Sequence, residues 1–478
     1  MRWLVVLLLL APAIAAADEL GGKADAFRDA IHARHLTPEG LLLYRVDLRA
    51  VRRDLAEGTY PEYADGPTFN GLWAGAACAR AESSEGAERA RALADAAKAL
   101  DGLELLMDVT GVRGLIARSA RRAPPRASNP SHWREGAGRF AGWWWRGDVS
   151  QDQYANGLVP AVGLCRRLFP ERARRLAVDA ASHLVSHDYQ LIDANGKRTK
   201  YGDLSWTSGL GFNAIGQLTS YAVISLAARL DTDPRWLAER DRLRDRYRVV
   251  ARARFTNVRV FGVTGHSNDL MAFDLYRVLV PLARETRDPA LRDLRNGLWR
   301  AWVRVKPDRN AFLTGIFCEL EPGACPAELL AGVHDSLAEF PLEKRKVKPS
   351  PELAALPTRW LPGRKWKSLA RDVVPMRLRP ASSFEWKSSP YRVTHGSEPN
   401  TEYTGLDYLA AYWLYASVCR TRGDCPGATA ASASSSAARA ESMPRDLAWT
   451  STRSRFSGMT DRRARVPASS PPSSATAR

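Results

Sequence analysis

The sequence predicts an all-α protein in which six helical hairpins close into an (α/α)6 toroid, with a short N-terminal leader and a disordered C-terminal tail. Several helical segments are apolar on every side, which is typical of buried helices. They cover residues 71–81, 154–169, 213–230, 270–284 and 405–419, with 307–317 as a weaker sixth member. Charged amphipathic segments alternate with them and suit an outer layer; these cover residues 86–120, 171–187 and 235–255.

A polar loop precedes each apolar segment. The loops are rich in Gly, Asp, Asn, Ser and Trp, and they cover residues 64–70, 146–153, 202–212, 265–269 and 395–404. A feature that recurs at comparable but irregular intervals is a degenerate repeat. In a toroid these loops all lie at the N-terminal ends of the inner helices. Free backbone N–H groups and the helix dipole favour anionic or hydroxyl-rich ligands there.

The two ends of the chain differ from this body. Residues 1–17 combine Arg2, an apolar run and three alanines, which predicts a cleaved secretion signal. That run is too short to cross a bilayer and no later stretch is apolar enough, so we expect an exported protein, periplasmic or extracellular, without a stable membrane anchor. We expect residues 18–60 to form a leader that packs on the body, 61–426 the toroid, and 427–478 a low-complexity, disordered tail.

The charge of the chain limits its partners. The formal net charge is +18 over 478 residues. This excess favours an anionic partner such as an acidic polysaccharide, although an arginine-rich solvated surface explains it as well. An exported chain without a recognition motif is not expected to bind nucleic acid. No residue cluster has metal-ligand spacing, and no P-loop or dinucleotide fingerprint occurs, so we expect neither a metal nor a cofactor.

The six cysteines fall into two groups. Cys318 and Cys325 bracket one glycine-containing turn, and Cys419 and Cys425 bracket another. An oxidising compartment would allow a disulfide at each turn, but spacing alone does not decide whether either forms. The other two cysteines lie in apolar helical segments, so we interpret them as buried small hydrophobic residues; they are Cys78 and Cys165.

The most aromatic loop, residues 143–157, contains the leading catalytic candidates. Asp148 and Asp152 lie four residues apart where this loop enters a helix, so their carboxylates point the same way if the helix has already begun. Glycoside hydrolysis needs two carboxyl groups, one as proton donor and one as base or nucleophile. Capping of the inner helix is the competing interpretation. Sugars offer both apolar faces and hydroxyl groups, which suits three further residues as substrate contacts: Trp144, Trp145 and Arg146.

Two other loops supply rival carboxylates. Asp203 lies in a glycine-rich loop together with Trp206, whose ring could stack on a sugar. Asp269 lies in the sequence GHSND before another apolar helix. Either could be the base that faces Asp148 across the cavity. A role in a turn or a helix cap is the alternative for each of them.

A different chemistry is also consistent with the GHSND loop. A polysaccharide lyase neutralises a uronate carboxylate with Asn, His or Arg, while a Tyr or His abstracts the proton at C5. His266 and Asn268 from this loop, with Arg146 and one of Tyr154, Tyr276 or Tyr403, would supply those groups. The competing interpretation of His266 is a loop histidine with a structural hydrogen bond.

Several short motifs resemble those of a known superfamily. The loops read W-R-G-D-x-S-x-D-Q, G-D-x-S-W and S-N-D, and residues 407–413 read D-Y-L-x-A-Y-W. Over residues 60–425 the layout resembles the six-hairpin glycosidase superfamily. That resemblance implies an (α/α)6 toroid and a carbohydrate ligand. The superfamily includes hydrolases, polysaccharide lyases, epimerases and non-catalytic members, so it does not determine an activity.

The sequence therefore favours an exported carbohydrate-active protein, and most simply a glycoside hydrolase that uses rim carboxylates. The first alternative is a lyase or epimerase that acts on an acidic polysaccharide. The second is a non-catalytic glycan-binding or envelope scaffold protein on the same fold. Whether the protein is an enzyme, which glycan it binds and its oligomeric state stay open at this point.

Overall fold

The structure is a computed structural model, and it describes residues 19–50, 63–124, 132–256, 265–359, 369–393, 396–423 and 425. By internal contacts the chain divides into Met1–Ser436 and Ala437–Arg478, and all described residues belong to the first unit. The predicted secretion signal and the predicted tail at 427–478 lie outside the described residues. Within the described residues, no helix is long and apolar enough to cross a membrane.

Most described elements are helices, as predicted. One set corresponds to the apolar segments and is buried along nearly its whole length; it comprises α2 (Gly66–Glu82), η6 with α4 (Gln153–Leu158 and Val159–Cys165), α6 (Ala214–Leu230), α8 (His266–Glu285), α10 (Ala311–Leu320) and α13 (Leu406–Arg422). We call these the inner helices. Each packs on the next along the chain, α13 packs on α2, and α4 also contacts α8.

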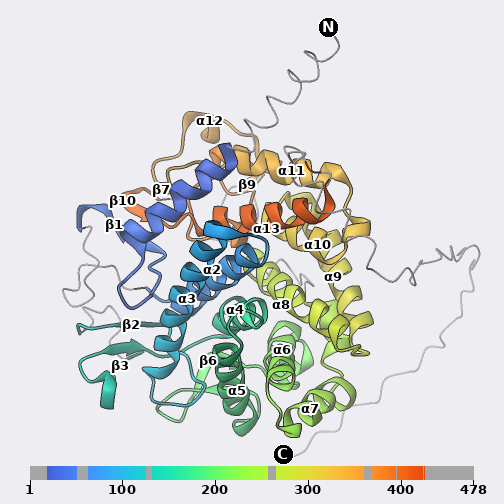
Figure 1. Cartoon of the computed structure of the whole chain (residues 1–478). Coiled ribbons are helices and arrows are strands. Elements are labelled where there is room, and N and C mark those ends of the chain that lie inside the picture. Colours follow the sequence, from blue (N-terminus) through green and yellow to red (C-terminus); the bar gives the residue numbers. More distant parts are fainter. Residues whose placement is uncertain are drawn as a thin grey trace, which may run out of the picture. The chain divides into compact units, whose positions relative to one another are not determined.

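A second set of helices packs against the inner ones. It comprises α3 (Gly86–Asp108), α5 (Pro170–Ser186), α7 (Pro234–Asp241), α9 (Leu291–Val305) and α11 (Ala327–Ala338). Figure 1 shows α5, α7 and α11 outside α4, α6 and α10. These helices are amphipathic, and α9 buries Leu294, Leu298 and Trp302 on one face while Val303 is exposed on the other. Their contacts with the inner helices remove the apolar faces from water.

The predicted helix over residues 235–255 is wrong in its extent. The segment instead forms three elements. The α-helix α7 ends at Asp241, the π-helical turn η8 (Arg242–Arg246) follows it directly, and the 3-10 helix η9 (Val250–Phe255) comes after a short break. Arg248 between the last two has a φ of 55°. A non-glycine residue in the left-handed region cannot continue a right-handed helix, so the chain turns there.

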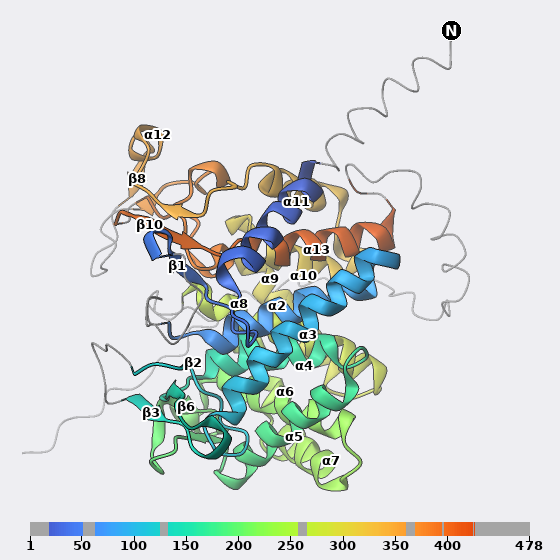
Figure 2. The same ribbon diagram turned by 60° about the vertical axis from the view of Figure 1, so that its left-hand side comes forward.

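The description of the fold as purely helical is also too simple. Short antiparallel strands form the sheets β1-β10-β7 and β2-β4-β3 and the pairs β5-β6 and β8-β9. Their bounds are β1 Arg45–Asp47, β2 Ser119–Arg121, β3 Trp133–Glu135, β4 Trp144–Arg146, β5 Gln190–Ile192, β6 Arg198–Asp203, β7 Arg345–Lys346, β8 Thr358–Arg359, β9 Leu369–Ala370 and β10 Glu398–Tyr403. Figure 2 shows β1, β10, β2, β3 and β6 along one side of the helices. These strands are too short to give a recognisable period-two pattern.

The remaining elements are short. The helix over residues 19–30 continues as the π-helical turn η1 (Ile31–His35) and packs on α13, where the Tyr408 hydroxyl donates to the Leu20 carbonyl at 2.9 Å. Single turns include η2 (Leu48–Ala50), η5 (Gly138–Phe140), η7 (Ser208–Gly211), η10 (Lys306–Asp308), η11 (Pro322–Ala324), α12 (Pro351–Ala354), η12 (Met376–Leu378) and η13 (Glu385–Lys387).

Three disulfides connect the six cysteines. Cys318–Cys325 and Cys419–Cys425 are the two small-loop bridges that the sequence allowed. The interpretation of Cys78 and Cys165 as unbridged residues is wrong, because these two also form a disulfide. They meet because α2 and α4 pack side by side and place both residues near the C-terminal ends of these helices. Burial was expected correctly, but local sequence does not show which helices become neighbours.

Candidate functional site

Side chains at the starts of neighbouring inner helices hydrogen-bond to each other. Gln153, which begins η6, donates to the Asp65 carboxylate before α2 at 3.2 Å. Asn213, which caps α6, donates to the Gln151 side chain at 3.2 Å. These bonds require the N-terminal ends of α2, η6 and α6 to lie together.

The other three inner helices are connected in the same way. His266 Nε2, at the start of α8, lies 3.3 Å from an Asp308 carboxylate oxygen before α10. Asn310 caps α10 and donates to the Trp386 carbonyl at 2.9 Å. The Trp386 indole in turn donates to the carbonyl of Asp407, near the start of α13, at 2.6 Å. We call the residues at these N-terminal ends, with the loops that enter them, the rim.

The most compact polar group on the rim is a pair of carboxylates held by one amide. Gln153 Nε2 donates to Asp65 Oδ1 at 3.2 Å and to Asp152 Oδ2 at 3.1 Å. An amide nitrogen carries two hydrogens, so it can serve both acceptors at once. The Ser150 N–H donates to Gln153 Oε1 at 2.8 Å and fixes the orientation of the amide, and the Ser150 hydroxyl bonds the other oxygen of Asp152.

Two cations flank this pair. Arg118 Nη2 donates to Asp65 Oδ1 at 3.1 Å, and Lys387 Nζ lies 3.9 Å from Asp65 Oδ2. The Asp65 side chain is 26% exposed, and those of Arg118 and Lys387 are about as accessible. Asp152 is also partly exposed. The charged groups of this cluster can therefore be reached by a ligand from solvent.

An aromatic pair adjoins the carboxylates. Tyr44 stacks on Phe69 with ring centroids 4.7 Å apart, and Lys387 Nζ lies 5.2 Å from the Phe69 centroid. Burial raises the pKa of Tyr44, while the neighbouring Arg45 lowers it and Asp65 raises it further. The phenol is therefore neutral at neutral pH. Of the predicted ligand-binding residues, Tyr403 lies opposite Arg45 in the pairing of β1 with β10, and Arg146 ends strand β4.

Asp148 and Asp203 occupy different positions from Asp152. Asp148 has a φ of 56°, and its Oδ1 accepts the Lys200 N–H at 2.8 Å. Asp203 accepts the Ser205 hydroxyl at 2.7 Å and pairs with Arg198 at 3.1 Å. Both carboxylates join strand β6 to adjacent loops. The hydrogen bond from Ser205 to Asp203 fits a role in a turn, which is the alternative that the sequence analysis gave for Asp203.

Asp269 lies further from solvent. Its side chain is 3% exposed, and it forms an ion pair with Arg304 of α9. The carboxylate therefore joins the inner helix α8 to its outer neighbour. The structure does not bring Asp269 together with Asp65 and Asp152 in any described contact.

The predicted tryptophan contacts are divided between the core and the rim. Trp145 is buried, and the Arg134 guanidinium lies over its ring at 5.3 Å, whereas Trp144 on the same strand is partly exposed. Trp206 is partly exposed as well, but one of its faces stacks on Tyr247 at 3.8 Å. The Trp206 ring also has the Tyr189 ring at its side, with centroids 5.5 Å apart, so Trp144 and the exposed part of Trp206 are the aromatic surfaces that can meet a ligand.

His266 belongs to a second polar group on the rim. Asp308 lies between His266 and Tyr391, whose hydroxyl donates to Asp308 Oδ1 at 3.1 Å. The His266 side chain is 16% exposed, and because Nε2 faces Asp308, Nδ1 is the nitrogen that can reach a ligand. Asn268 is partly exposed in the first turn of α8, and its main-chain N–H donates to the Gly265 carbonyl at 2.9 Å.

Sequence reasoning did not select four members of the carboxylate cluster. Gln153 stands inside the W-R-G-D-x-S-x-D-Q motif and Asp65 inside a loop recognised as polar, so a signal for both was present. Arg118 comes from a segment assigned to an outer helix, and Lys387 comes from the long segment between α11 and α13. Only the packing of those segments brings the two cations to the rim.

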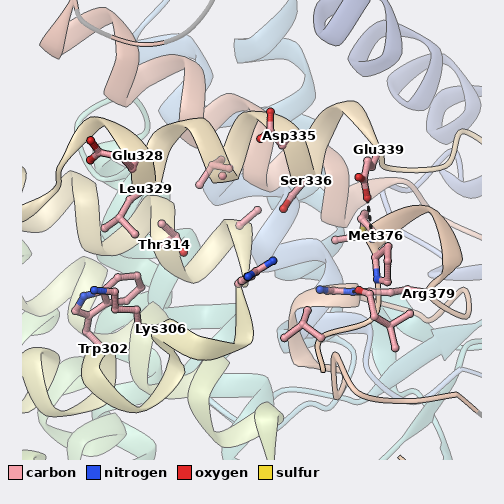
Figure 3. Close-up of a pocket in the computed structure, with 17 residues that line it drawn as sticks. Trp302, Lys306, Thr314, Glu328, Leu329, Asp335, Ser336, Glu339, Met376 and Arg379 are labelled. Carbon is pink, nitrogen blue, oxygen red and sulfur yellow. Dashed lines mark hydrogen bonds between the residues drawn. The ribbon is translucent and has the colours of Figure 1, made fainter. Parts of the chain in front are cut away.

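A separate cavity of about 530 Å³ opens between α10, α11 and residues 373–379 (Figure 3). Glu328 and Asp335 line its α11 wall, and Lys306 and Arg379 lie on the opposite wall. None of the residues predicted from the sequence to be functional lines this cavity. In the part of the chain that the structure describes, no group of three His, Cys, Asp or Glu side chains is placed to hold a metal ion.

Comparisons with known proteins give little further guidance. No protein-family model and no curated protein matches the chain. Among solved structures, a GH family 9 endoglucanase, J30, matches with 14% identity and a TM-score of 0.40, and covers 75% of this chain and 74% of that one. A Zn-binding triple mutant of the same endoglucanase matches with 13% identity and the same TM-score of 0.40. At this level of similarity the comparison assigns neither a family nor an activity to the chain.

Proposed function

We propose that the protein is an exported carbohydrate-active enzyme, a glycoside hydrolase whose base is the carboxylate pair Asp65–Asp152. The observation that carries this proposal is the bridging of both carboxylates by the Gln153 amide at the partly exposed rim. Two acceptors held this close can bind one water molecule and remove its proton as its oxygen attacks the anomeric carbon. The three disulfides are consistent with an oxidising compartment.

The scaffold of this proposal is an (α/α)6 toroid. Support comes from the contacts that run from α2 through the other inner helices to α13 and back to α2. Polar contacts also join the starts of α2, η6 and α6 to one another, and those of α8, α10 and α13 to one another, which supports a common direction of the inner helices within each group. With the helix over residues 19–30 on α13, six outer elements accompany the six inner ones.

The reaction also needs a proton donor for the leaving oxygen, and we assign it to His266. His266 Nε2 lies 3.3 Å from an Asp308 carboxylate oxygen, and Nδ1 is the nitrogen that we assign to the leaving oxygen. As the glycosidic bond breaks, the proton passes from His266 to the departing oxygen. The proton from the attacking water passes to the Asp65–Asp152 pair. In one turnover His266 therefore loses one proton and the carboxylate pair gains one.

The substrate class that we infer is an acidic glycan. Arg118 and Lys387 lie beside the carboxylate pair, and the main-chain N–H of Arg118 donates to the Arg146 carbonyl at 2.8 Å. Their charges can bind a uronate carboxylate next to the bond that is cleaved. Trp144 and Trp206, both partly exposed, can cover the apolar faces of neighbouring sugar rings.

A second candidate function is a polysaccharide lyase. The contacts of Asp308 with both His266 and Tyr391 favour it, because a histidine supported by a carboxylate is a suitable base for the C5 proton. In that reaction Arg146 and Asn268 would neutralise the uronate carboxylate. The two candidates share the rim but differ in which groups are essential.

The test is a panel of neutral and acidic polysaccharides assayed for reducing ends and for ultraviolet absorbance. A hydrolase releases reducing ends without absorbance, and we expect Asp65→Asn and Asp152→Asn each to lower turnover by about 100-fold or more. Asp335→Asn, an exposed aspartate on α11, is the matched control and should leave turnover unchanged. Absorbing products that disappear in His266→Gln would establish the lyase instead.

Two results would contradict an enzymatic role for the rim. One is full activity in both Asp65→Asn and Asp152→Asn. The other is a wild-type protein that binds a polysaccharide in the panel but cleaves none of them. The second result would identify a glycan-binding or scaffold protein on this fold.

A further inference from the structure

Three large hydrophobic side chains are exposed where β6 leads into α6. Leu210 is 94% exposed, Phe212 82% and Tyr201 59%. The first two are the highest values for large hydrophobic residues within the described ranges. Isolated exposed apolar residues are common on proteins. Two almost fully exposed ones on a single tight turn indicate an interaction surface.

The backbone of this turn projects the side chains outward. Gly209, Leu210 and Gly211 have φ values of 58°, 55° and 85°, so three consecutive residues are left-handed. A leucine is uncommon in this region, and such strain persists only where neighbouring structure maintains it. Here the Phe212 N–H donates to the Gly209 carbonyl at 3.0 Å, and Asn213 Nδ2 donates to the Ser208 hydroxyl at 3.1 Å.

A basic segment lies against the same turn. Trp206, just before the turn, stacks on Tyr247 at 3.8 Å, and Arg252 Nη1 donates to the Trp206 carbonyl at 2.9 Å. These contacts bring residues 246–255 beside Leu210 and Phe212. That segment exposes Arg246, Arg248 and Arg254.

The hairpin formed by β5 and β6 adds further positive charge. It exposes Lys197 and Lys200, and Lys200 Nζ lies 5.2 Å from the Tyr201 ring. Two of the nearby acids are paired, Asp203 with Arg198 and Asp245 with Arg244, and the charge of a third, the exposed Asp188, acts on Arg242. Among the described residues no carboxylate lies within ion-pair distance of the five exposed cations, which are Lys197, Lys200, Arg246, Arg248 and Arg254.

We propose that this surface docks the protein peripherally on an anionic lipid membrane. The docking surface consists of the apolar residues Tyr201, Leu210 and Phe212 and the five cations named above. Apolar side chains on a turn can enter the boundary between headgroups and acyl chains, while lysine and arginine bind lipid phosphates around them. The proposal does not use the carboxylate pair and does not rest on the proposed hydrolase activity.

Other occupants fit these observations less well. In a symmetric dimer this surface would face itself, which would place the five cations opposite an identical set. Sugar rings favour flat aromatic faces with hydrogen-bonding groups beside them, whereas Leu210, the most exposed residue, offers neither. Charge and apolar exposure together favour a lipid surface.

The test is co-sedimentation of the full chain with vesicles. We expect binding to vesicles that contain phosphatidylglycerol, much weaker binding to phosphatidylcholine vesicles, and a loss of binding as salt rises. Leu210→Ser with Phe212→Ser should lower the partition coefficient by roughly tenfold or more, because two apolar side chains no longer leave water. Lys197→Gln with Lys200→Gln should lower it by roughly fivefold or more, and only on anionic vesicles.

The matched control removes two exposed apolar side chains elsewhere. Val303 is 68% exposed and Leu342 56%, and we expect Val303→Ser with Leu342→Ser to bind like the wild type. Equal binding to both vesicle types, or unchanged binding by the Leu210→Ser, Phe212→Ser variant, would overturn the proposal. A wild-type dimer that this variant dissociates would identify a second copy as the occupant instead. Loss of soluble-polysaccharide binding without any effect on vesicle binding would identify a glycan.

Discussion

Asp65 and Asp152 precede different inner helices, yet both accept a hydrogen bond from the side-chain amide of Gln153. The amide is fully buried, while the two carboxylates are partly exposed. Gln153 therefore acts as a positioning residue that sets the separation of two groups that a ligand can reach. Its contribution can be separated experimentally from a purely structural one.

Replacement of Gln153 by leucine should remove both bonds with little change in volume. We expect turnover on the cleaved polysaccharide to fall by roughly 100-fold with a small change in KM, because misplaced catalytic groups affect the reaction more than binding. We also expect a loss of about 1–3 kcal/mol in unfolding free energy from the unmade hydrogen bonds. Steady-state kinetics and urea denaturation measure the two effects.

Gln217→Leu is the control for this prediction. Gln217 is as buried as Gln153, lies on the neighbouring helix α6, and bonds Arg252 at 3.0 Å without touching either carboxylate. It should lower stability to a similar degree and leave turnover close to that of the wild type. Equal losses of turnover in the two variants would show that Gln153 has no specific positioning role.

Glu402 should make the protein sensitive to acid. Burial raises the pKa of this carboxyl, but His35, whose Nε2 lies 3.6 Å away, and Arg34, which donates to it at 2.7 Å, outweigh burial and lower the pKa to about 2. The unfolded chain binds the proton at a higher pH, so the stabilisation is complete above about pH 4.5 and is lost as the pH falls toward 2. We expect the difference in unfolding free energy between wild type and Glu402→Gln to shrink over that interval.

The control for Glu402 is on the same strand. Glu398 pairs with Lys346 but its side chain is 46% exposed, so Glu398→Gln should change stability little at any pH. Denaturation in urea at several pH values tests both variants. A wild-type to Glu402→Gln difference that stays constant between pH 4.5 and 2 would contradict the assignment.

His183 should affect the stability of the fold at higher pH than Glu402 does. Burial, and next the charge of His187, lower the pKa of His183 to about 4. The unfolded chain binds a proton near pH 6.5, so between about 6.5 and 4 it binds more protons than the folded chain and acid destabilises the fold. We expect His183→Gln to flatten this part of the stability profile, measured as melting temperature against pH. His334, which pairs with the exposed Asp335 and is itself 19% exposed, provides the control His334→Gln, which should leave the profile unchanged.

The disulfides should differ in their contribution to stability. Cys78 and Cys165 are 87 residues apart, and Cys419 and Cys425 are 6 apart. Because a longer closed loop restricts the unfolded chain more, we expect about 4–5 kcal/mol from the first bridge and about 2 kcal/mol from the second. Double alanine variants of each pair, compared by guanidinium denaturation, measure these values. Equal losses would show that local packing, not loop length, dominates.

Much of the helical layout was predictable because it depends on local composition. The helices α2, α6, α8 and α13 are apolar around their circumference, and such segments can only be buried. The break at Arg248 was not predictable, since an arginine-rich helix gives no signal for a left-handed residue. The strand Trp144–Arg146 was missed because three residues are too few for a strand pattern.

The sequence by itself determined which segments are buried helices and that polar loops rich in aspartate enter them. Tertiary structure decided which of those aspartates meet. Asp152 lies with Asp65, whereas Asp148 bonds the backbone of Lys200 and Asp269 pairs with Arg304. The reason is that helical periodicity and loop composition are local properties, while a carboxylate pair depends on side chains brought together from distant segments by helix packing. The sequence therefore predicted a polar rim, and packing selected the residues that form its carboxylate cluster.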